Sequence, residues 1–132
     1  MAPSMTTRPP LLLLVFAFGA AIAQEEPEEG CRGSSTYEES VCLSAKYKKI
    51  DADLNAAYRR ALKSATHYGE ENVQKLKDAQ RKWIVYRDGA CNAEFNLWGN
   101  GTGGPIAYRS CLIRLTRERS THLRCTYRFF SD

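Results

Sequence analysis

Residues 79–91 read AQRKWIVYRDGAC, and this segment shows most directly how the chain folds. Six residues in and before it follow one another at intervals of three and four: Val73, Leu76, Gln80, Trp83, Arg87 and Ala90. Such spacing places side chains on one face of a helix. Because lysines and aspartates occupy the other side, we expect an amphipathic helix from Glu71 to Ala90.

Two further helices are expected, over residues 36–66 and 106–123, where apolar residues recur at the same spacing. The first begins with Thr36 and Glu39, which are spaced as in a capping box. Glycines in residues 92–105 should prevent a helix there. No segment alternates convincingly with a period of two. The sequence therefore predicts an all-α fold, a small antiparallel helical hairpin with a third helix packed across it.

The cysteines place disulfides in this bundle. There are five of them: Cys31, Cys42, Cys91, Cys111 and Cys125. In an antiparallel arrangement the first four lie at one end and Cys125 at the other. Four cysteines can pair in three ways. We favour Cys91–Cys111, which would close the glycine-rich loop and stabilise the fold by roughly 3 kcal/mol. Cys31–Cys42 would follow, and Cys125 would stay free or link two chains.

The N-terminus has the form of a cleaved signal peptide over residues 1–23. Arg8 precedes an apolar run over residues 11–18, and the small-residue pattern Ala21-Ile-Ala23 precedes Gln24. The apolar run is shorter than the roughly 20 residues of a spanning helix, so we expect no membrane span after cleavage. The signal peptide also implies an oxidising compartment in which disulfides persist.

The remaining chain should comprise an acidic, flexible linker (24–35), the helical domain and a C-terminal tail (124–132). Without Arg8, 18 lysines and arginines face 15 aspartates and glutamates, a net charge of +3. This charge is too small to indicate a nucleic-acid partner. We expect a protein partner instead, and the sequence leaves the oligomeric state open.

Polar residues occupy helix faces that should be buried: Asp51, Asn55, Gln80, Arg87 and Arg119. In the hairpin, Asp51 falls opposite residues 83–87 and at the level of Arg119. A buried guanidinium without acceptors is costly, so we expect Asp51 to be a shared counter-ion for Arg87 and Arg119. A carboxylate between guanidiniums stays ionised and is unsuited to proton donation. We therefore predict a structural polar network rather than an acid–base site.

The loop after the second helix is the candidate partner-binding site. Its candidate residues are Phe95, Leu97, Trp98 and Asn100. Large aromatic side chains on an anchored loop are typical of binding hot spots. The alternative is that Phe95 and Trp98 fold back and cap the end of the bundle, and the sequence leaves both interpretations open.

Three segments resemble motifs of the LprI-type lysozyme-inhibitor family. Residues 51–58 match D-x-x-L-N-x-x-Y, residues 79–91 match A-Q-R-x-W-[IL]-x-[YF]-R-D-x-x-C, and residues 111–123 match C-L-x-x-x-T-x-x-R-x-x-x-L. Cys31 and Cys42 resemble the paired cysteines upstream. The resemblance covers about residues 31–123. It departs from the family in Cys125 with its tail, and in lacking the lipoprotein cysteine of some members.

The resemblance implies a small helical domain of the bacterial envelope, periplasmic or secreted. For the family's namesake it implies binding and inhibition of lysozyme, and it transfers no catalytic residue. The sequence itself has no recognisable nucleophile, phosphate loop or metal-ligand cluster, so we expect no enzyme activity and no cofactor. Our hypothesis is an exported inhibitor of lysozyme, or of a related glycan-cleaving enzyme, that acts by steric occlusion. The alternative is a non-enzymatic envelope interaction or immunity-type protein that neutralises another toxin.

Overall fold

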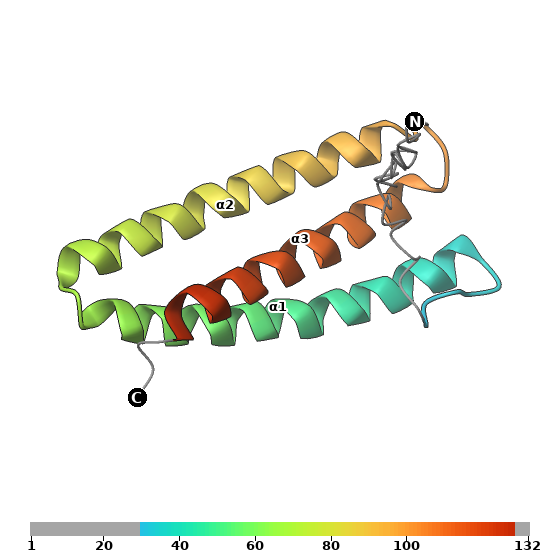
Figure 1. Ribbon diagram of the computed structural model, residues 1–132. Coiled ribbons are helices and arrows are strands. Elements are labelled where there is room, and N and C mark those ends of the chain that lie inside the picture. Colours follow the sequence, from blue (N-terminus) through green and yellow to red (C-terminus); the bar gives the residue numbers. More distant parts are fainter. Residues whose placement is uncertain (1–29, 129–132) are drawn as a thin grey trace, which may run out of the picture.

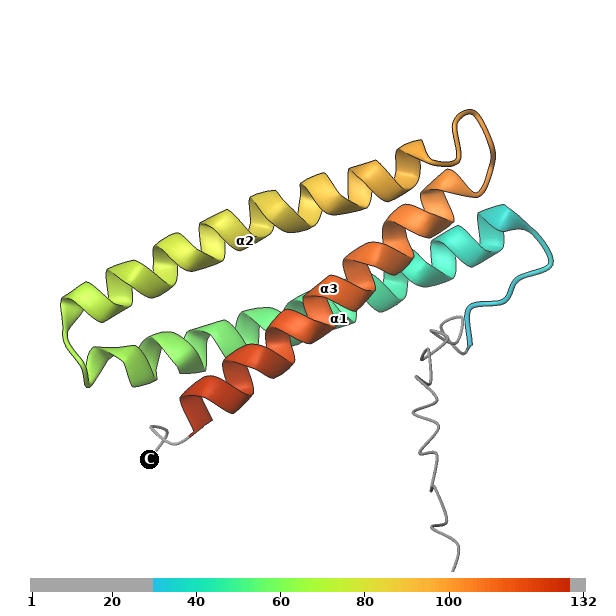
Figure 2. The same ribbon diagram turned by 45° about the horizontal axis from the view of Figure 1, so that its top comes forward.

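A computed structural model describes residues 30–128 as three helices (Figure 1). They are α1 (Thr36–Thr66), α2 (Glu70–Asn96) and α3 (Gly104–Tyr127). α1 and α2 form an antiparallel hairpin, and α3 returns beside them in the direction of α1 (Figure 2). The described residues contain no strand. The predicted all-α bundle is therefore confirmed, whereas the predicted signal peptide lies outside the described residues.

α1 has the predicted bounds, but its N-cap lies one residue earlier than predicted. Ser35, not Thr36, is the N-cap, and its hydroxyl accepts a hydrogen bond from the backbone N–H of Glu38. The Glu38 carboxylate in turn accepts from the hydroxyl and the backbone N–H of Ser34, at 2.6 and 2.9 Å. Two neighbouring serines thus share the capping role that the sequence pattern assigned to Thr36 and Glu39.

The second helix is longer than predicted at its C-terminal end. It continues past Ala90 to Asn96, so the expectation that residues 92–105 exclude a helix is wrong for the first part of that segment. The physical reason is that residues 92–96 contain neither glycine nor proline. At the other end, Gly69 has a φ of +92°, which lets the chain turn sharply between α1 and α2.

The third helix extends beyond both predicted ends. It begins at Gly104 with Pro105 in its first turn, a position where the missing N–H of proline costs nothing. It continues to Tyr127, so the tail expected from residue 124 begins inside the helix.

α3 is the central element of the core. It packs most extensively on α1 and next on α2, while α1 and α2 touch each other least. Buried side chains form three clusters, and α3 contributes to each of them: Leu123 near the hairpin turn, Leu112 and Leu115 around Cys91–Cys111, and Ile113 beside Cys31. No helix within residues 30–128 is both long and apolar enough to cross a membrane.

Replacing both Cys91 and Cys111 by alanine should lower the free energy of unfolding by about 3 kcal/mol, because the bond closes a loop across a sequence separation of 20. Urea denaturation measures this loss. Cys125→Ser is the control, because the Cys125 thiol is free and exposed. A loss in the double variant no larger than that in the control would contradict a stabilising role for this bond.

The cap of α1 should make stability depend on pH. Hydrogen bonds from the Ser34 hydroxyl and then the Ser34 N–H hold the pKa of Glu38 below its ordinary value. A carboxyl with a lowered pKa stabilises the fold above its unfolded-state pKa, and the stabilisation is lost as pH falls through the folded-state pKa. Glu38→Gln should therefore lower the thermal midpoint at neutral pH and have no effect in acid. A difference that persists below about pH 3 would contradict this role.

Candidate functional site

Both disulfides lie at the end of the bundle where α1 begins and α2 ends. Cys31 is bonded to Cys42 with an S–S distance of 2.04 Å, and Cys91 to Cys111 with 2.02 Å. These are the two pairs expected from the sequence. Cys125 lies at the opposite end, as expected, and its thiol is free. We call the first end, with its loop over residues 97–103, the disulfide end.

Two side-chain contacts add to the rigidity of the disulfide end. An Arg114 Nη nitrogen on α3 lies 2.7 Å from a carboxylate oxygen of Glu94 on α2. The Arg109 Nε–H on α3 donates to the hydroxyl of Ser44 on α1 at 2.5 Å. The start of α3 is therefore fixed to both other helices, so the loop before it has an anchored base.

The aromatic residues of the loop region pack on the bundle and also remain partly exposed. A Cβ added at Gly103 would clash with the Trp98 ring, and one at Gly104 would meet the Phe95 ring at 3.0 Å. Both rings thus lie against the glycine backbone at the start of α3. Yet 37% of Phe95 and 56% of Trp98 remain exposed, so each ring also presents a surface to solvent.

The other two predicted loop residues point outward. Leu97 is 85% exposed, more than any other large apolar residue described, and Asn100 is exposed in the turn that follows. An apolar side chain this exposed contributes little to the fold. Leu97 is therefore the residue of the loop best suited to contact a partner without a structural role.

A second exposed surface was missed in the sequence analysis. We call it the α2 stripe, and it comprises Val85, Tyr86, Gly89, Ala93 and Leu97, all exposed. Val85, Gly89, Ala93 and Leu97 follow one another at intervals of four, on a different face from the buried seam. Tyr86 lies next to Val85 and three residues before Gly89. The spacing was present in the sequence but was overlooked because the Trp83 seam explained the helix. The α2 stripe leads directly into the loop and extends its apolar surface along the helix.

The predicted polar network is centred on Arg87, whose side chain is only 11% exposed. Its Nε and Nη2 atoms each lie 2.8 Å from Oδ1 of Asp88. Its guanidinium also stacks over the rings of Trp83 and Tyr47, with centroid distances of 5.1 and 5.9 Å. The charge of Arg87 is thus balanced mainly by the next residue in the chain and by two aromatic faces.

Asp51 pairs with Arg87, as predicted, but is not shared with Arg119. Its Oδ1 is 3.9 Å from Nη1 of Arg87, its side chain is 39% exposed, and it accepts a hydrogen bond from Asn55. Arg119 instead donates from Nε to Oε1 of Gln80 at 3.0 Å. The prediction placed these residues at the correct level but took no account of Asp88, which lies closer to Arg87 than Asp51 does.

Among residues 30–128, no three histidine, cysteine, aspartate or glutamate side chains are grouped so that they could hold a metal ion. Neither His67 nor His122 hydrogen-bonds to a nucleophilic side chain in the contacts of the described chain.

The fold and the disulfide end define a small, disulfide-bonded, all-α domain that exposes apolar side chains at one end. The model of the family described as lysozyme inhibitor LprI matches residues 31–123. The chain therefore belongs to the LprI lysozyme-inhibitor family. It is also similar to an uncharacterized protein of Rhizobium meliloti strain 1021, with 33% identity over 132 residues that cover 91% of this chain and 94% of that protein. No solved structure shows significant similarity to the present chain.

The geometry of the network predicts unequal costs for its members. Arg87→Ala should lower the free energy of unfolding by about 2–4 kcal/mol. The substitution removes a buried side chain from the core and leaves Asp88 without its ion-pair partner. Asp51→Ala should lower the free energy of unfolding by about 1 kcal/mol or less, because the Asp51–Arg87 distance is long and the Asp51 side chain is partly exposed. Denaturant titration of both variants measures the difference. Equal costs would show that Asp51 is the principal counter-ion of Arg87 after all.

Proposed function

We propose that this protein binds a lysozyme, or a related glycan-cleaving enzyme, and inhibits it by steric occlusion. The observation that carries the proposal is the family match over residues 31–123, which spans the three helices almost completely. An inhibitor of this kind needs no reacting groups of its own. It needs a rigid surface that fills a substrate groove and keeps the glycan out.

The disulfide end is the part of the surface that best meets this need. Leu97 is exposed and Trp98 is partly exposed on a loop whose base is tied by Cys91–Cys111. A pre-organised loop loses little conformational entropy on binding, and aromatic anchors supply most of the energy of many interfaces. The α2 stripe continues this surface, so the loop would enter the groove while α2 covers its rim.

Charge would contribute less than apolar contact. Lysozymes are commonly basic, and a chain whose net charge is +3 without the predicted signal peptide gains no long-range attraction toward them. Local complementarity remains available, because Glu38 and Glu39 lie in the first turn of α1, at the disulfide end. We therefore expect the affinity to depend only weakly on salt.

The proposal includes export to the bacterial periplasm or the medium. The two disulfides support an oxidising compartment, since such bonds rarely persist in the cytosol. Lysozyme also acts on the cell wall, so an inhibitor must reach the same compartment.

The test is the clearing of a bacterial cell-wall suspension by egg-white lysozyme, with and without the purified protein. Wild type should protect the walls in a dose-dependent way. Leu97→Asp should weaken inhibition about tenfold or more while leaving the thermal midpoint unchanged. Gly89→Arg should also weaken it, because it places a long charged side chain on the α2 stripe.

Gly89→Ala is the matched control for that last variant. A Cβ at Gly89 has nothing within 4 Å, so alanine should keep inhibition intact and stabilise α2 by about 1 kcal/mol. Full inhibition by both Leu97→Asp and Gly89→Arg would place the contact elsewhere on the protein. If even saturating wild type gave no protection, lysozyme inhibition would be refuted. The alternative of an envelope protein that neutralises another toxin would then be favoured.

A further inference from the structure

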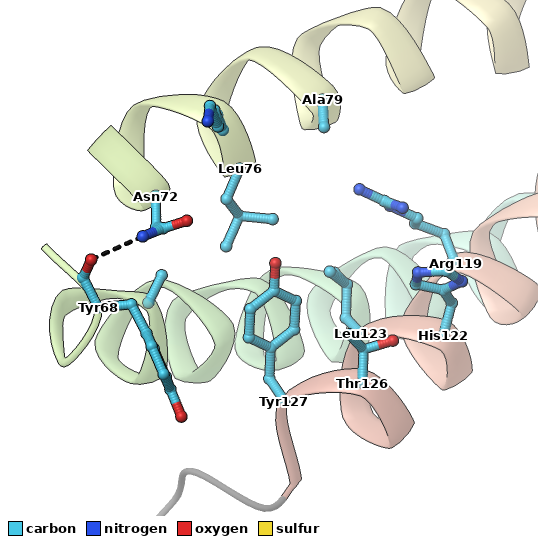
Figure 3. A pocket seen from close by; sticks show the side chains of 11 residues that line it. Tyr68, Asn72, Leu76, Ala79, Arg119, His122, Leu123, Thr126 and Tyr127 are labelled. Carbon is cyan, nitrogen blue, oxygen red and sulfur yellow. Dashed lines mark hydrogen bonds between the residues drawn. The ribbon is translucent and has the colours of Figure 1, made fainter. Parts of the chain in front are cut away.

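A cavity of about 400 Å³ lies between α2 and α3 near the hairpin turn, at the end opposite the disulfides (Figure 3). Leu76, Ala79 and Leu123 supply apolar surface to it. Tyr68, Thr126 and Tyr127 also line it, toward the turn and the end of α3. None of the residues of the disulfide end lines this cavity. It is therefore a separate site from the surface proposed to bind lysozyme.

The ionisable groups around the cavity favour an anion. Lys75, Arg119 and His122 line it, and none of its lining residues is an aspartate or glutamate. The ammonium group of Lys75 is paired with Glu71 at 2.7 Å on the exposed surface of α2. Arg119 is therefore the principal charged group that the cavity offers to a ligand.

Arg119 is held in place but lacks an anionic partner. Its Nε–H donates to Gln80, and its guanidinium lies 5.9 Å from the centroid of the Trp83 ring. Arg87 and Arg114 each have a carboxylate oxygen within 2.8 Å, whereas no carboxylate of the described chain lies within 4.0 Å of Arg119. Burial lowers the pKa of Arg119, as expected for a charge that is partly removed from water without compensation.

This arrangement leaves the outer nitrogens of Arg119 available. A guanidinium has five N–H donors, and the bond to Gln80 uses the one on Nε. Figure 3 shows the side chain extending from α3 toward Ala79, into the space between the two helices. The two Nη nitrogens offer the forked geometry that binds a carboxylate through two parallel hydrogen bonds.

We propose that this cavity binds a small amphipathic carboxylate, such as a medium-chain fatty acid. The carboxylate would accept hydrogen bonds from the Nη atoms of Arg119, and the hydrocarbon chain would lie on Leu76 and Leu123. The cavity has the volume that about 13 water molecules occupy in the liquid, which suits a ligand of roughly a dozen non-hydrogen atoms. The bond between Arg119 and Gln80 can remain intact when such a ligand binds.

The test is a calorimetric titration of decanoate, kept below its micelle concentration, into the purified protein. Acetate, which has the carboxylate but no long chain, and 1-decanol, which has the chain but no carboxylate, are titrated for comparison. Decanoate should bind more tightly than either. Arg119→Gln should weaken decanoate binding about tenfold and abolish its advantage over decanol. The control is Arg117→Gln, an equal change of charge at an exposed position on the same helix. It should change neither the affinity for decanoate nor the preference for decanoate over 1-decanol.

Ala79→Trp provides a second variant that leaves Arg119 in place. Ala79 is an exposed residue that lines the cavity, so the indole should fill it and abolish binding without removing core contacts. Arg119→Lys keeps the charge and should retain the preference for decanoate if Arg119→Gln unfolds the protein. Equal binding of decanoate and decanol to wild type, or unchanged binding to Ala79→Trp, would overturn the proposal.

Discussion

The covalent tie between α2 and α3 is the constraint on which the rest of this structure depends. α2 touches α1 little, so its position is set by α3, and Cys91–Cys111 joins the two across the glycine-rich loop. Both cysteines are buried, and Leu112 and Leu115 pack around them. The same bond fixes the base of the loop that carries Leu97 and Trp98. A small domain with a modest core thereby obtains a firmly anchored loop at its disulfide end.

Trp83 is the second point at which α2 and α3 are coupled. Its ring contacts the core clusters on both sides and is flanked by the guanidiniums of Arg87 and Arg119, from different helices. The two arginines differ in their surroundings. Arg87 is buried beside the carboxylate of Asp88. Within the described chain, Arg119 has only the side-chain amide of Gln80 as a hydrogen-bond partner and lines a cavity. Similar residues on neighbouring helices can thus serve different purposes.

The helices, their order and the disulfide pairs followed from the sequence because each has a local or topological signal. Intervals of three and four define a helix face, and antiparallel topology brings Cys91 and Cys111 to one end. Exact helix ends followed less well. The choice of Ser35 as cap depends on backbone geometry over one or two residues. The continuation of α2 to Asn96 did have a sequence signal, because residues 92–96 contain neither glycine nor proline, but the glycines further along the segment outweighed it in the prediction. The Asp51 prediction held for Arg87 but not for Arg119, and it missed the closer partner Asp88, for a related reason. Helix register gives the level of a side chain but not its rotamer, and Asp88 needed only a local rotation to reach Arg87.

For the candidate site, too, positions along the chain could be predicted from the sequence, whereas contacts that depend on tertiary packing could not. Trp98 could be placed on the loop from the sequence, but its packing on Gly103 could not, because that contact depends on how the loop folds back onto α3. The spacing of the α2 stripe can be read from the sequence. Only the packing of α3 on α2 shows which of the two apolar faces of α2 remains exposed to solvent. The cavity beside Arg119 left no sequence signal, since it is made by the gap between two helices. The apolar surface of the disulfide end and an arginine without a carboxylate partner among the described residues are therefore separate features of one bundle. A ligand that paired with Arg119 would compensate that charge and, by binding only the folded state, would stabilise the packing of α2 on α3.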